Sequence, residues 1–367
     1  MGKSIQNQYM PDSISPPGET ILETLETLGM TQVDLAERTG RSRKMINEII
    51  KGKAPITPKM AIELERVVDV PATFWNNRES QYRETLARLE EHDRLQAQVE
   101  WLGDFPINDM AKWGWIEKCR EKVPQLQEVL RFFGIASSER LPEVTEKLSR
   151  QVAFRKSEAF EVDNTALIAW LRKGELDAKE MPCEKYNEKR FQETLNTIRH
   201  LSIEPPIVFQ HELKQLCAAC GVAVVFVPEL PKTRVSGATR WLTPNKALIQ
   251  LSLRYKSDDH LWFSFFHEAG HILKHGKKKI FIEGTSMEMA ADKEDVANRF
   301  AADCLIPRSK YKRLVETPPY SKSKIKAFAA QLGIAPGIVV GRLQHDKFLP
   351  MKNCNDLKKR FEWVRKQ

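Results

Sequence analysis

The 367-residue sequence lacks a long hydrophobic run, and no stretch approaches 18 uninterrupted apolar residues. A transmembrane helix of ordinary length is therefore excluded. The first twenty residues, MGKSIQNQYMPDSISPPGET, contain no apolar segment of the kind found in secretory signals, so no signal is expected. Six cysteines are too few for a disulfide scaffold in a chain of this length, and they predict reduced thiols in a cytoplasmic protein.

Hydrophobic residues make up 41% of the chain and charged residues 29%, which excludes a wholly disordered or collagen-like protein. Neither an internal repeat nor a low-complexity tract is visible. The length predicts two or three domains. The pattern is helical from about residue 16 to residue 94 and mostly helical to the Pro205-Pro206 pair, after which strands and helices mix.

The net charge of +9 is unevenly distributed along the chain. Residues 1–80 carry ten Lys and Arg and eleven Asp and Glu, whereas residues 308–367 carry fifteen and four. The basic excess thus lies at the end of the chain. Three uses of it remain open, namely recruitment of an acidic substrate, contact with DNA phosphates, and solvation of a helical surface.

Two short helices joined by a glycine turn are predicted near the N-terminus, over residues 31–39 and 42–51. These are the proportions of a helix-turn-helix, whose second helix reads the major groove of DNA. Seven Lys and Arg and one Glu lie from Arg38 to Lys59, although a helical bundle with a solvated basic edge is the alternative. The candidate base contacts are Arg41, Ser42, Arg43, Lys44 and Asn47, and the candidate phosphate contacts are Gln32 and Lys51.

This segment also predicts a small core, with Ala36 where the two helices cross. The core candidates are Val33, Leu35, Met45, Ile46 and Ile49. Over roughly residues 16–80, the run TQ-x-x-LAE, the IxxGK segment, ITP and the FW pair resemble the XRE-type domain of HigA-like antitoxins. The resemblance implies a five-helix DNA-binding domain that usually dimerises on a palindromic operator.

Four of the eight histidines lie from His260 to His275, and two of them belong to the sequence HEAGH at residues 267–271. On a helix, residues four apart share one face, so His267 and His271 can hold one Zn²⁺. Glu268 can then take a proton from a water that the metal activates. The preceding FSFF indicates a buried helix, in which histidines need polar partners even without a metal.

A catalytic zinc site needs a third protein ligand, and the segment EDVANRFAADCLIP supplies one. Glu294, Ala297 and Ala301 recur at helical spacing, so a carboxylate and two small side chains share a face that can approach the histidine helix closely. The competing carboxylates are Asp292 and Asp295. The candidates for orienting the ligands are Asn298 and His275. Two histidines and one carboxylate can hold Mn²⁺ as well as Zn²⁺.

The residues from about 206 to 310 resemble the ImmA/IrrE family of metallo-endopeptidases. The matching features are SGATRW, ALIQLSL, FSFFHEAGHILKH and E-x-x-AN-x-FAA-x-x-LIP. The resemblance implies zinc ligands His267, His271 and Glu294, with Glu268 as catalytic base. It also implies cleavage of a repressor protein that governs stress, prophage or mobile-element genes.

Three further segments are interpreted from their patterns. ALIQLSL is the candidate edge strand for pairing with an extended substrate. Cys217 and Cys220 lie three apart in an amphipathic helix and are expected on its core face. The C-terminal segment around Gly333 has a faint helix-turn-helix rhythm, and we interpret it as part of the peptidase module.

The predicted fold is multidomain and mainly α. We expect a leader at 1–15, a five-helix helix-turn-helix domain at 16–94, a helical linker domain at 95–205, an α+β zincin-like peptidase domain with a small antiparallel sheet at 206–310, and a basic helical subdomain at 311–367. The predicted protein is a cytoplasmic transcriptional regulator that binds operator DNA as a homodimer through its N-terminal half. Its zinc-dependent endopeptidase would cleave a repressor or antitoxin-like protein, and no membrane partner is expected. The alternative is a non-catalytic HigA-like repressor whose metal site is structural or sensory.

Overall fold

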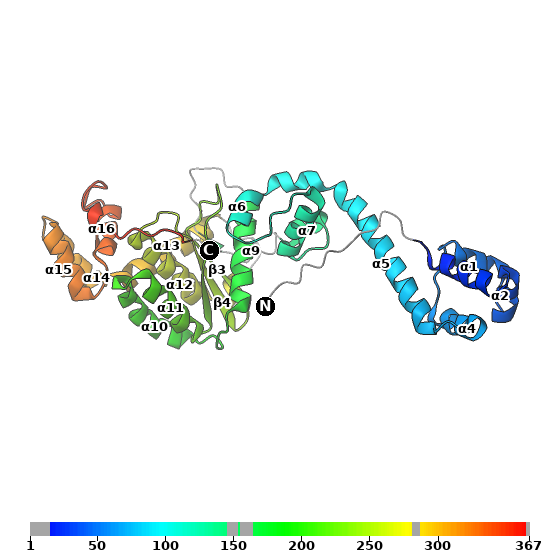
Figure 1. Ribbon diagram of the computed structural model, residues 1–367. Helices are drawn as coiled ribbons and strands as arrows, with labels where there is room; N and C mark the ends of the chain where they lie inside the picture. The colour runs from blue at the N-terminus through cyan, green and yellow to red at the C-terminus, as the bar shows by residue number, and fades with distance from the viewer. Residues whose placement is uncertain (1–14, 145–152, 155–163, 281–286, 365–367) are drawn as a thin grey trace. The chain divides into compact units, whose positions relative to one another are not determined.

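The computed structural model describes residues 15–144, 153–154, 164–280 and 287–364. Its contacts divide the chain into two compact units, which we name the N-terminal unit (Met1–Val99) and the C-terminal unit (Glu100–Gln367). Figure 1 labels helices and strands within both units.

The N-terminal unit consists of five helices in the part that the structure describes. They are α1 (Pro17–Thr27), α2 (Gln32–Thr39), α3 (Arg43–Ile50), α4 (Pro58–Val68) and α5 (Ala72–Gln96). Thr31 and Asp34 form a reciprocal capping box at the start of α2, and Gly40 ends that helix in the left-handed conformation. Ser42 accepts a hydrogen bond from the Met45 backbone N–H and so begins α3.

The core of this unit follows the predicted face, with two exceptions. Leu35, Ala36, Ile46 and Ile49 are all buried. Val33 is only half-buried and does not belong to the core cluster. Met45 is 40% exposed, so its predicted place in the core was wrong. Around the helix, residue 45 lies at the boundary between the buried face, which carries Ile46 and Ile49, and the exposed recognition face. Periodicity alone does not decide whether a residue at this boundary is buried or exposed.

The C-terminal unit combines helices with one small sheet. Its short 3₁₀ turns are η1 (Val99–Asp104), η2 (Ser138–Arg140), η3 (Leu201–Ile203) and η4 (Asn355–Leu357). Its strands are β1 (Ala153–Phe154), β2 (Val222–Phe226), β3 (Gly237–Thr243) and β4 (Lys246–Leu251). Its helices are α6 (Ile107–Lys112), α7 (Lys122–Phe133), α9 (Asn164–Glu180), α10 (Glu188–His200), α11 (Pro206–Ala218), α12 (Asp258–Ile280), α13 (Met287–Leu305), α14 (Arg308–Val315), α15 (Lys322–Leu332) and α16 (Pro336–His345).

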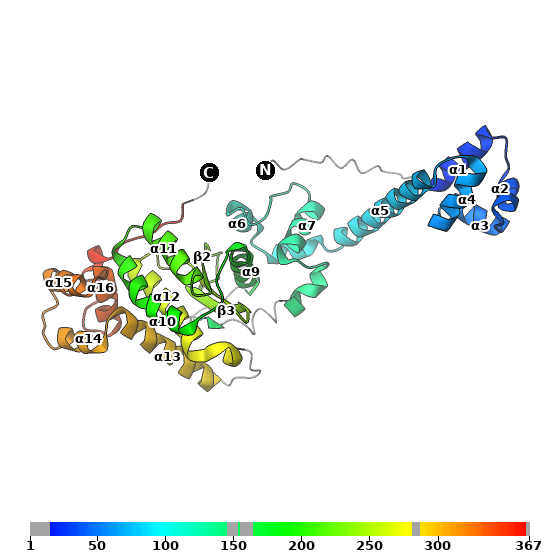
Figure 2. The same ribbon diagram turned by 90° about the horizontal axis from the view of Figure 1, so that it is seen from below.

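The sheet lies between two helical layers, with α9 on one face and α10, α11 and α12 on the other (Figure 2). Successive side chains of β2 point to opposite faces, so Val222 and Val224 join the core beneath α11 and α12 while Ala223 and Val225 pack toward α9. Because both faces are buried, the strands read as nearly continuous apolar runs. Helix α9 lies before residue 206, where the peptidase domain was predicted to begin, yet its side chains pack in the same core as the sheet.

The strand order is β1-β3-β4-β2, and the sheet is mixed. Strands β3 and β4 form the predicted antiparallel hairpin, whereas β2 pairs with β4 in parallel. The expectation of an antiparallel sheet was therefore wrong for β2. After β2 the chain forms β3 one place further along the sheet, and the hairpin then brings β4 between β3 and β2, parallel to β2. The segment ALIQLSL contains β4, which is central, so its predicted role as a free edge strand is also wrong.

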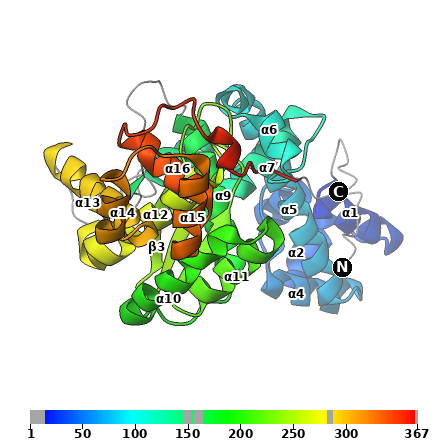
Figure 3. The same ribbon diagram turned by 90° about the vertical axis from the view of Figure 1, so that its left-hand side faces the viewer.

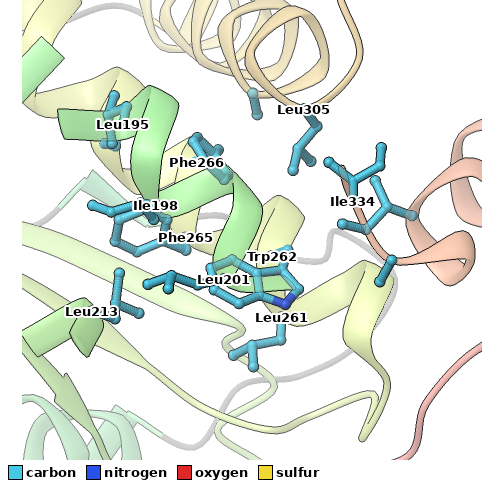
Figure 4. Close-up of a cluster of buried hydrophobic side chains, with 14 of the residues drawn as sticks. Leu195, Ile198, Leu201, Leu213, Leu261, Trp262, Phe265, Phe266, Leu305 and Ile334 are labelled. Atoms are coloured by element: carbon cyan, nitrogen blue, oxygen red, sulfur yellow. The ribbon is translucent and has the colours of Figure 1, made fainter. Parts of the chain in front are cut away.

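The largest core surrounds the first half of α12, which is buried on nearly every side. Trp262, Phe265 and Phe266 are each at most 1% exposed. Figure 4 shows these rings against leucine and isoleucine side chains from α10, α11 and α13. Burying aromatic side chains of this size contributes several kcal/mol in total, by a rough measure of about 25 cal/mol per Å² of apolar area. Helix α12 is thereby fixed against the sheet.

The C-terminal segment completes this unit instead of forming a detached tail. Helix α16 packs on α12 and α15 (Figure 3). The Phe361 backbone N–H donates to the Lys256 carbonyl, and the Lys358 Nζ lies 2.7 Å from Asp259 Oδ2. All six cysteines are free, and Cys217 and Cys220 lie buried in the main core as predicted.

Among the described residues, no single helix is both long and apolar enough to cross a membrane. Helices α15 and α16 meet such a criterion only as a pair bent by 114°. The apolar residues of that pair belong to the core of the C-terminal unit.

The first residue of α12 predicts a pH-dependent stability. Burial, opposed by the Lys359 backbone hydrogen bond and reinforced by Asp259, raises the pKa of Asp258 to about 6. The pKa of an Asp in the unfolded chain is about 4, so the folded chain binds this proton more tightly. The stabilisation that protonation of Asp258 provides is therefore complete below pH 4 and is lost as pH rises through 6. Relative to wild type, Asp258→Asn should gain about 3 kcal/mol of unfolding free energy between pH 4 and pH 7. Urea denaturation across this range measures the difference.

The exposed Asp93 on α5 offers the control, as Asp93→Asn should leave the pH profile of the wild type unchanged. A parallel shift of the Asp258→Asn curve, with the same slope as wild type at every pH, would contradict the assignment.

Candidate metal centre and nucleic-acid interface

Three predicted ligands converge where α12 and α13 face each other. His267 and His271 lie one turn apart on α12, and their Nε2 atoms are 3.0 Å apart. The carboxylate of Glu294 on α13 reaches both, with Oε2 3.2 Å from His267 Nε2 and Oε1 3.3 Å from His271 Nε2. One donor atom from each residue lies within 4.8 Å of the others. Two imidazole nitrogens and a carboxylate are the donor set of a zinc site with an open position.

Asn298 determines which nitrogen of His267 faces the cluster. Its Oδ1 lies 3.1 Å from His267 Nδ1, and an amide oxygen only accepts hydrogen bonds, so Nδ1 carries the proton. The Nε2 lone pair is then directed at the other ligands. A nitrogen lone pair and a carboxylate that point at one another repel unless a cation lies between them, either a metal ion or a proton on Nε2. The residues present therefore fit a divalent metal, and Asn298 has the predicted orienting position.

The charge of Glu294 also suits a metal ligand. Burial alone raises the pKa of this carboxyl, but hydrogen bonds with His267 and His271 outweigh that effect and hold its pKa well below the usual range. Glu294 is consequently ionised at neutral pH. Its side chain is 31% exposed, whereas those of the two histidines are 2% exposed, so the cluster meets solvent on the α13 side.

Glu268 lies on the sheet side of α12 and is 1% exposed. Strand β3 fixes its surroundings, because the Thr239 Oγ1 donates to the Glu268 carbonyl at 3.2 Å. Gly237 lies directly over the carboxylate, and a Cβ at that position would come within 2.7 Å of Glu268 Oε1. The absence of a side chain at Gly237 makes the space for the carboxylate. Sequence reasoning missed Gly237 as part of the site, and its only signal was a glycine at the start of the strand SGATRW.

Small residues allow the two helices to approach each other at the level of the ligands. Ala297 and Ala301 on α13 are fully buried. A Cβ on Gly270 of α12 would lie 3.3 Å from the Ala297 Cα and 3.0 Å from Phe300 Cδ1. Larger side chains here would separate the helices and move Glu294 away from the histidines.

Other sequence candidates lie apart from this cluster. Within the described residues, Asp292 and Asp295 do not join the group that could hold a metal. The side chain of His275 lies outside the part of the chain that the structure describes, so its orienting role stays a prediction. Tyr255 and His260, which lie near the motif in sequence, stack on each other with ring centroids 4.1 Å apart.

The predicted DNA contacts lie on α3 and beside it. Arg43 and Lys44 have side chains 70% and 85% exposed, and their nearest acidic partners are 3.9 Å away, which is too loose to fix them. Asn47 is also exposed on α3. The flanking candidates Gln32 and Lys51 are exposed at the ends of α2 and α3.

Two other candidates already have structural partners. Arg41 forms a two-point ion pair with Glu63 of α4, with both N–H···O distances at 2.8 Å. This pair fastens the turn between α2 and α3 to α4, and sequence reasoning missed it because the partners are 22 residues apart. The Ser42 hydroxyl accepts the capping hydrogen bond of α3. Contacts of Arg41 and Ser42 with DNA remain predictions.

Comparison with known proteins identifies both regions. A peptidase family model described as the IrrE N-terminal-like domain matches residues 221–344, and a model described as helix-turn-helix matches residues 21–75. The search of curated proteins returned no significant match. The chain therefore contains an XRE-type helix-turn-helix domain and an IrrE N-terminal-like domain, as the resemblances predicted. The match to the peptidase model extends to residue 344 in α16, past the predicted domain end at residue 310.

The ligand geometry predicts how metal content responds to substitution. We expect the wild-type protein to bind a divalent metal and both His267→Ala and Glu294→Gln to lose it, whereas Asn298→Ala should weaken metal affinity roughly 10–100-fold, because it removes only the partner that orients His267. Elemental mass spectrometry and titration against a chromogenic chelator measure both effects. The exposed His211 provides the control variant His211→Ala, which should bind metal as wild type does. Full metal occupancy in His267→Ala would contradict the assigned ligands.

Proposed function

We propose that this protein is a DNA-binding regulator whose C-terminal unit is a metal-dependent endopeptidase. The observation that carries the proposal is the convergence of His267, His271 and Glu294, with Glu268 held beside them on the same helix. A helix-turn-helix domain in the same chain links this site to gene regulation. Zn²⁺ is the metal we favour, and Mn²⁺ suits the same donors.

Each residue has a distinct task in the proposed reaction. When bound, the metal supplies Lewis acidity, which lowers the pKa of a water molecule and polarises a peptide carbonyl. Glu268 accepts the proton of the attacking water and delivers it to the leaving amide nitrogen. Gly237 and Thr239 hold the segment that carries Glu268 against β3. Asn298 keeps the His267 ring in one orientation, so the ligands need no rearrangement during turnover.

The protein substrate we infer is a repressor or an antitoxin-like protein that controls stress, prophage or toxin–antitoxin genes. This inference is supported by the resemblance to ImmA/IrrE endopeptidases and HigA-like antitoxins. Binding of operator DNA through α3, as a homodimer formed by the N-terminal unit, would place the peptidase near its target. The basic side chains of α3 and its flanks supply the attraction to phosphate.

A non-catalytic repressor with a structural or sensory metal is the second candidate. The burial of His267, Glu268 and His271, each at most 2% exposed, favours it, since structural sites are closed. The 31% exposure of Glu294 favours the peptidase, because it leaves a side of the cluster open. The Glu268 carboxylate discriminates between the two, as a structural site has no need of a base.

Substitution of the proposed base should abolish cleavage while sparing the metal. Glu268→Gln has nearly the same shape and should reduce the rate of repressor cleavage by at least about a hundredfold, because general-base catalysis contributes roughly 10²–10⁴. Purified protein with Zn²⁺ and candidate repressors, analysed by mass spectrometry of the fragments, measures this. Metal content and the thermal unfolding curve should match wild type. Identical fragments at equal rates from both proteins would overturn the catalytic role.

The recognition helix predicts two different effects on DNA binding. Arg43→Ala or Asn47→Ala should cost about 1–3 kcal/mol at the operator and relax its sequence preference, as each removes a base contact. Lys51→Ala should weaken binding to all DNA sequences. It should also reduce the slope of log affinity against log salt concentration by about one, because one phosphate contact is lost. Electrophoretic mobility or anisotropy titrations at several salt concentrations separate the two. Arg88→Ala on α5 is the control, and unchanged operator affinity in all three variants would refute the assignment of α3.

A further inference from the structure

A large groove adjoins the metal centre within the C-terminal unit. It has a volume of about 1240 Å³ and lies between α12, α13, α14, α16 and residues 347–358. Pockets for small molecules commonly measure roughly 300–1,000 Å³. The groove is therefore large enough for several side chains of a peptide segment.

The groove reaches the metal centre from behind, on the side of His267 that faces away from the other ligands. Asn298, which orients His267, is part of its wall. Phe263 lines the same end, and its ring centroid lies 6.2 Å from that of His267. Asp295 follows the ligand Glu294 directly along α13. A polypeptide that occupies the groove would thus lie along the helix pair that carries the metal ligands.

Part of the lining is apolar. Leu305, Ile306 and Ile338 belong to it. Phe348 and Met351, which follow α16, also line the groove, with 46% and 68% of their surfaces exposed. Large apolar side chains that gather in a concave, exposed place are typical of a binding surface. Methionine and phenylalanine together favour a partner with apolar anchors.

The charge of the groove is predominantly basic, with six Lys and Arg and three Asp in its lining. Lys358 is already paired with Asp259, and Arg342 with Asp346 at 2.7 Å. Lys312 is 77% exposed and 3.9 Å from its nearest acid. Within the described ranges, Arg308 and Lys347 form no ion pair and are exposed. Arg299 on α13 is likewise exposed and forms no ion pair among the described residues, so the uncompensated charge lies on α13, on α14 and after α16. We name Arg308, Lys312 and Lys347 the basic rim.

We propose that this groove is a docking site for the protein substrate, and that it selects a segment with apolar anchors flanked by acidic side chains. The inference rests on the proposed peptidase function and names the chemistry of its substrate. The apolar anchors would occupy the space beside Phe348 and Met351, and the acidic flanks would pair with Lys312 and Lys347. Complementary charge steers the encounter, and the buried anchors supply the affinity.

Nucleic acid fits the same groove less well. Asp295 and Asp303 on α13 line it on the side of the metal helix hairpin, and they would repel a phosphate backbone that followed its length. An acidic peptide can turn its neutral residues toward that end. The distribution of charge therefore favours a protein segment over DNA.

Binding of designed peptides to the full-length protein tests the proposal without cleavage. The probe is a labelled amphipathic peptide with Leu and Phe on one helical face and Asp and Glu on the other. Its counterpart carries Lys at every acidic position. Fluorescence anisotropy should show that the acidic peptide binds at least about tenfold more tightly. The difference should shrink as salt concentration rises.

Two sets of variants localise the binding. Lys312→Glu combined with Lys347→Glu should weaken the acidic peptide about tenfold. Lys189→Glu combined with Lys326→Glu changes the net charge equally at exposed sites outside the groove and should leave affinity within about twofold. Phe348→Ser combined with Met351→Ser should also weaken binding, and both residues are exposed enough for the fold to tolerate the change.

The outcomes separate this proposal from the peptidase itself. Three results would overturn the docking site. They are equal binding of the acidic and the Lys-containing peptide, equal losses of affinity in the Lys312/Lys347 variant and the Lys189/Lys326 control, and tighter binding of duplex DNA than of the acidic peptide at the rim. If repressor cleavage occurs but is insensitive to the rim variants, the docking site is wrong while the peptidase stands. If Glu268→Gln and wild type bind the acidic peptide alike and neither cleaves protein, the groove stands while the peptidase is wrong.

Discussion

The close contact between α12 and α13 is the constraint on which the proposed chemistry depends. His267 and His271 share a face of α12 through helical geometry alone, but two histidines do not make a catalytic metal site. The third ligand, Glu294, can reach the histidines because Ala297 packs against α12 at Gly270 with no larger side chain between the two helices. The small residues thus determine whether Glu294 reaches the histidines, and the aromatic core around Trp262 keeps α12 in place.

The surrounding fold gives each side of α12 a separate role. The sheet side holds Glu268 between the helix and β3, where Gly237 provides the space. The α13 side carries the exposed edge of Glu294, and the groove runs along the same helix from Asp295 to Leu305. The basic C-terminal segment, whose purpose the charge count left open, forms the far wall of that groove. Its charge is therefore arranged around a cavity beside the metal centre, which favours the first of the three uses considered, recruitment of an acidic partner.

Local features were predictable from the sequence, and most of those that depend on distant contacts were not. Glu294 and Asn298 are the exceptions, because the small residues at helical spacing beside them indicated a helix that approaches the histidines closely. Caps and a glycine turn marked α2 and α3, and four-residue spacing placed His267 with His271. Strand order was not predictable, because the alternation of side chains shows which face of a strand is buried but not which strands are its neighbours. For this reason the parallel β2–β4 pair and the central place of β4 were missed. The Arg41–Glu63 pair, the space at Gly237 and the groove all join segments far apart in the chain, so spacing gave no sign of them.

The central claim is that α12 and α13 together hold one catalytic divalent metal. Crystals of the protein grown with Zn²⁺, measured on both sides of the zinc absorption edge, test it most directly. We expect one strong anomalous peak about 2.0–2.2 Å from His267 Nε2, His271 Nε2 and a Glu294 oxygen, with a fourth position that is not filled by the protein. A peak at another set of ligands, or a fourth protein ligand that closes the site, would contradict it.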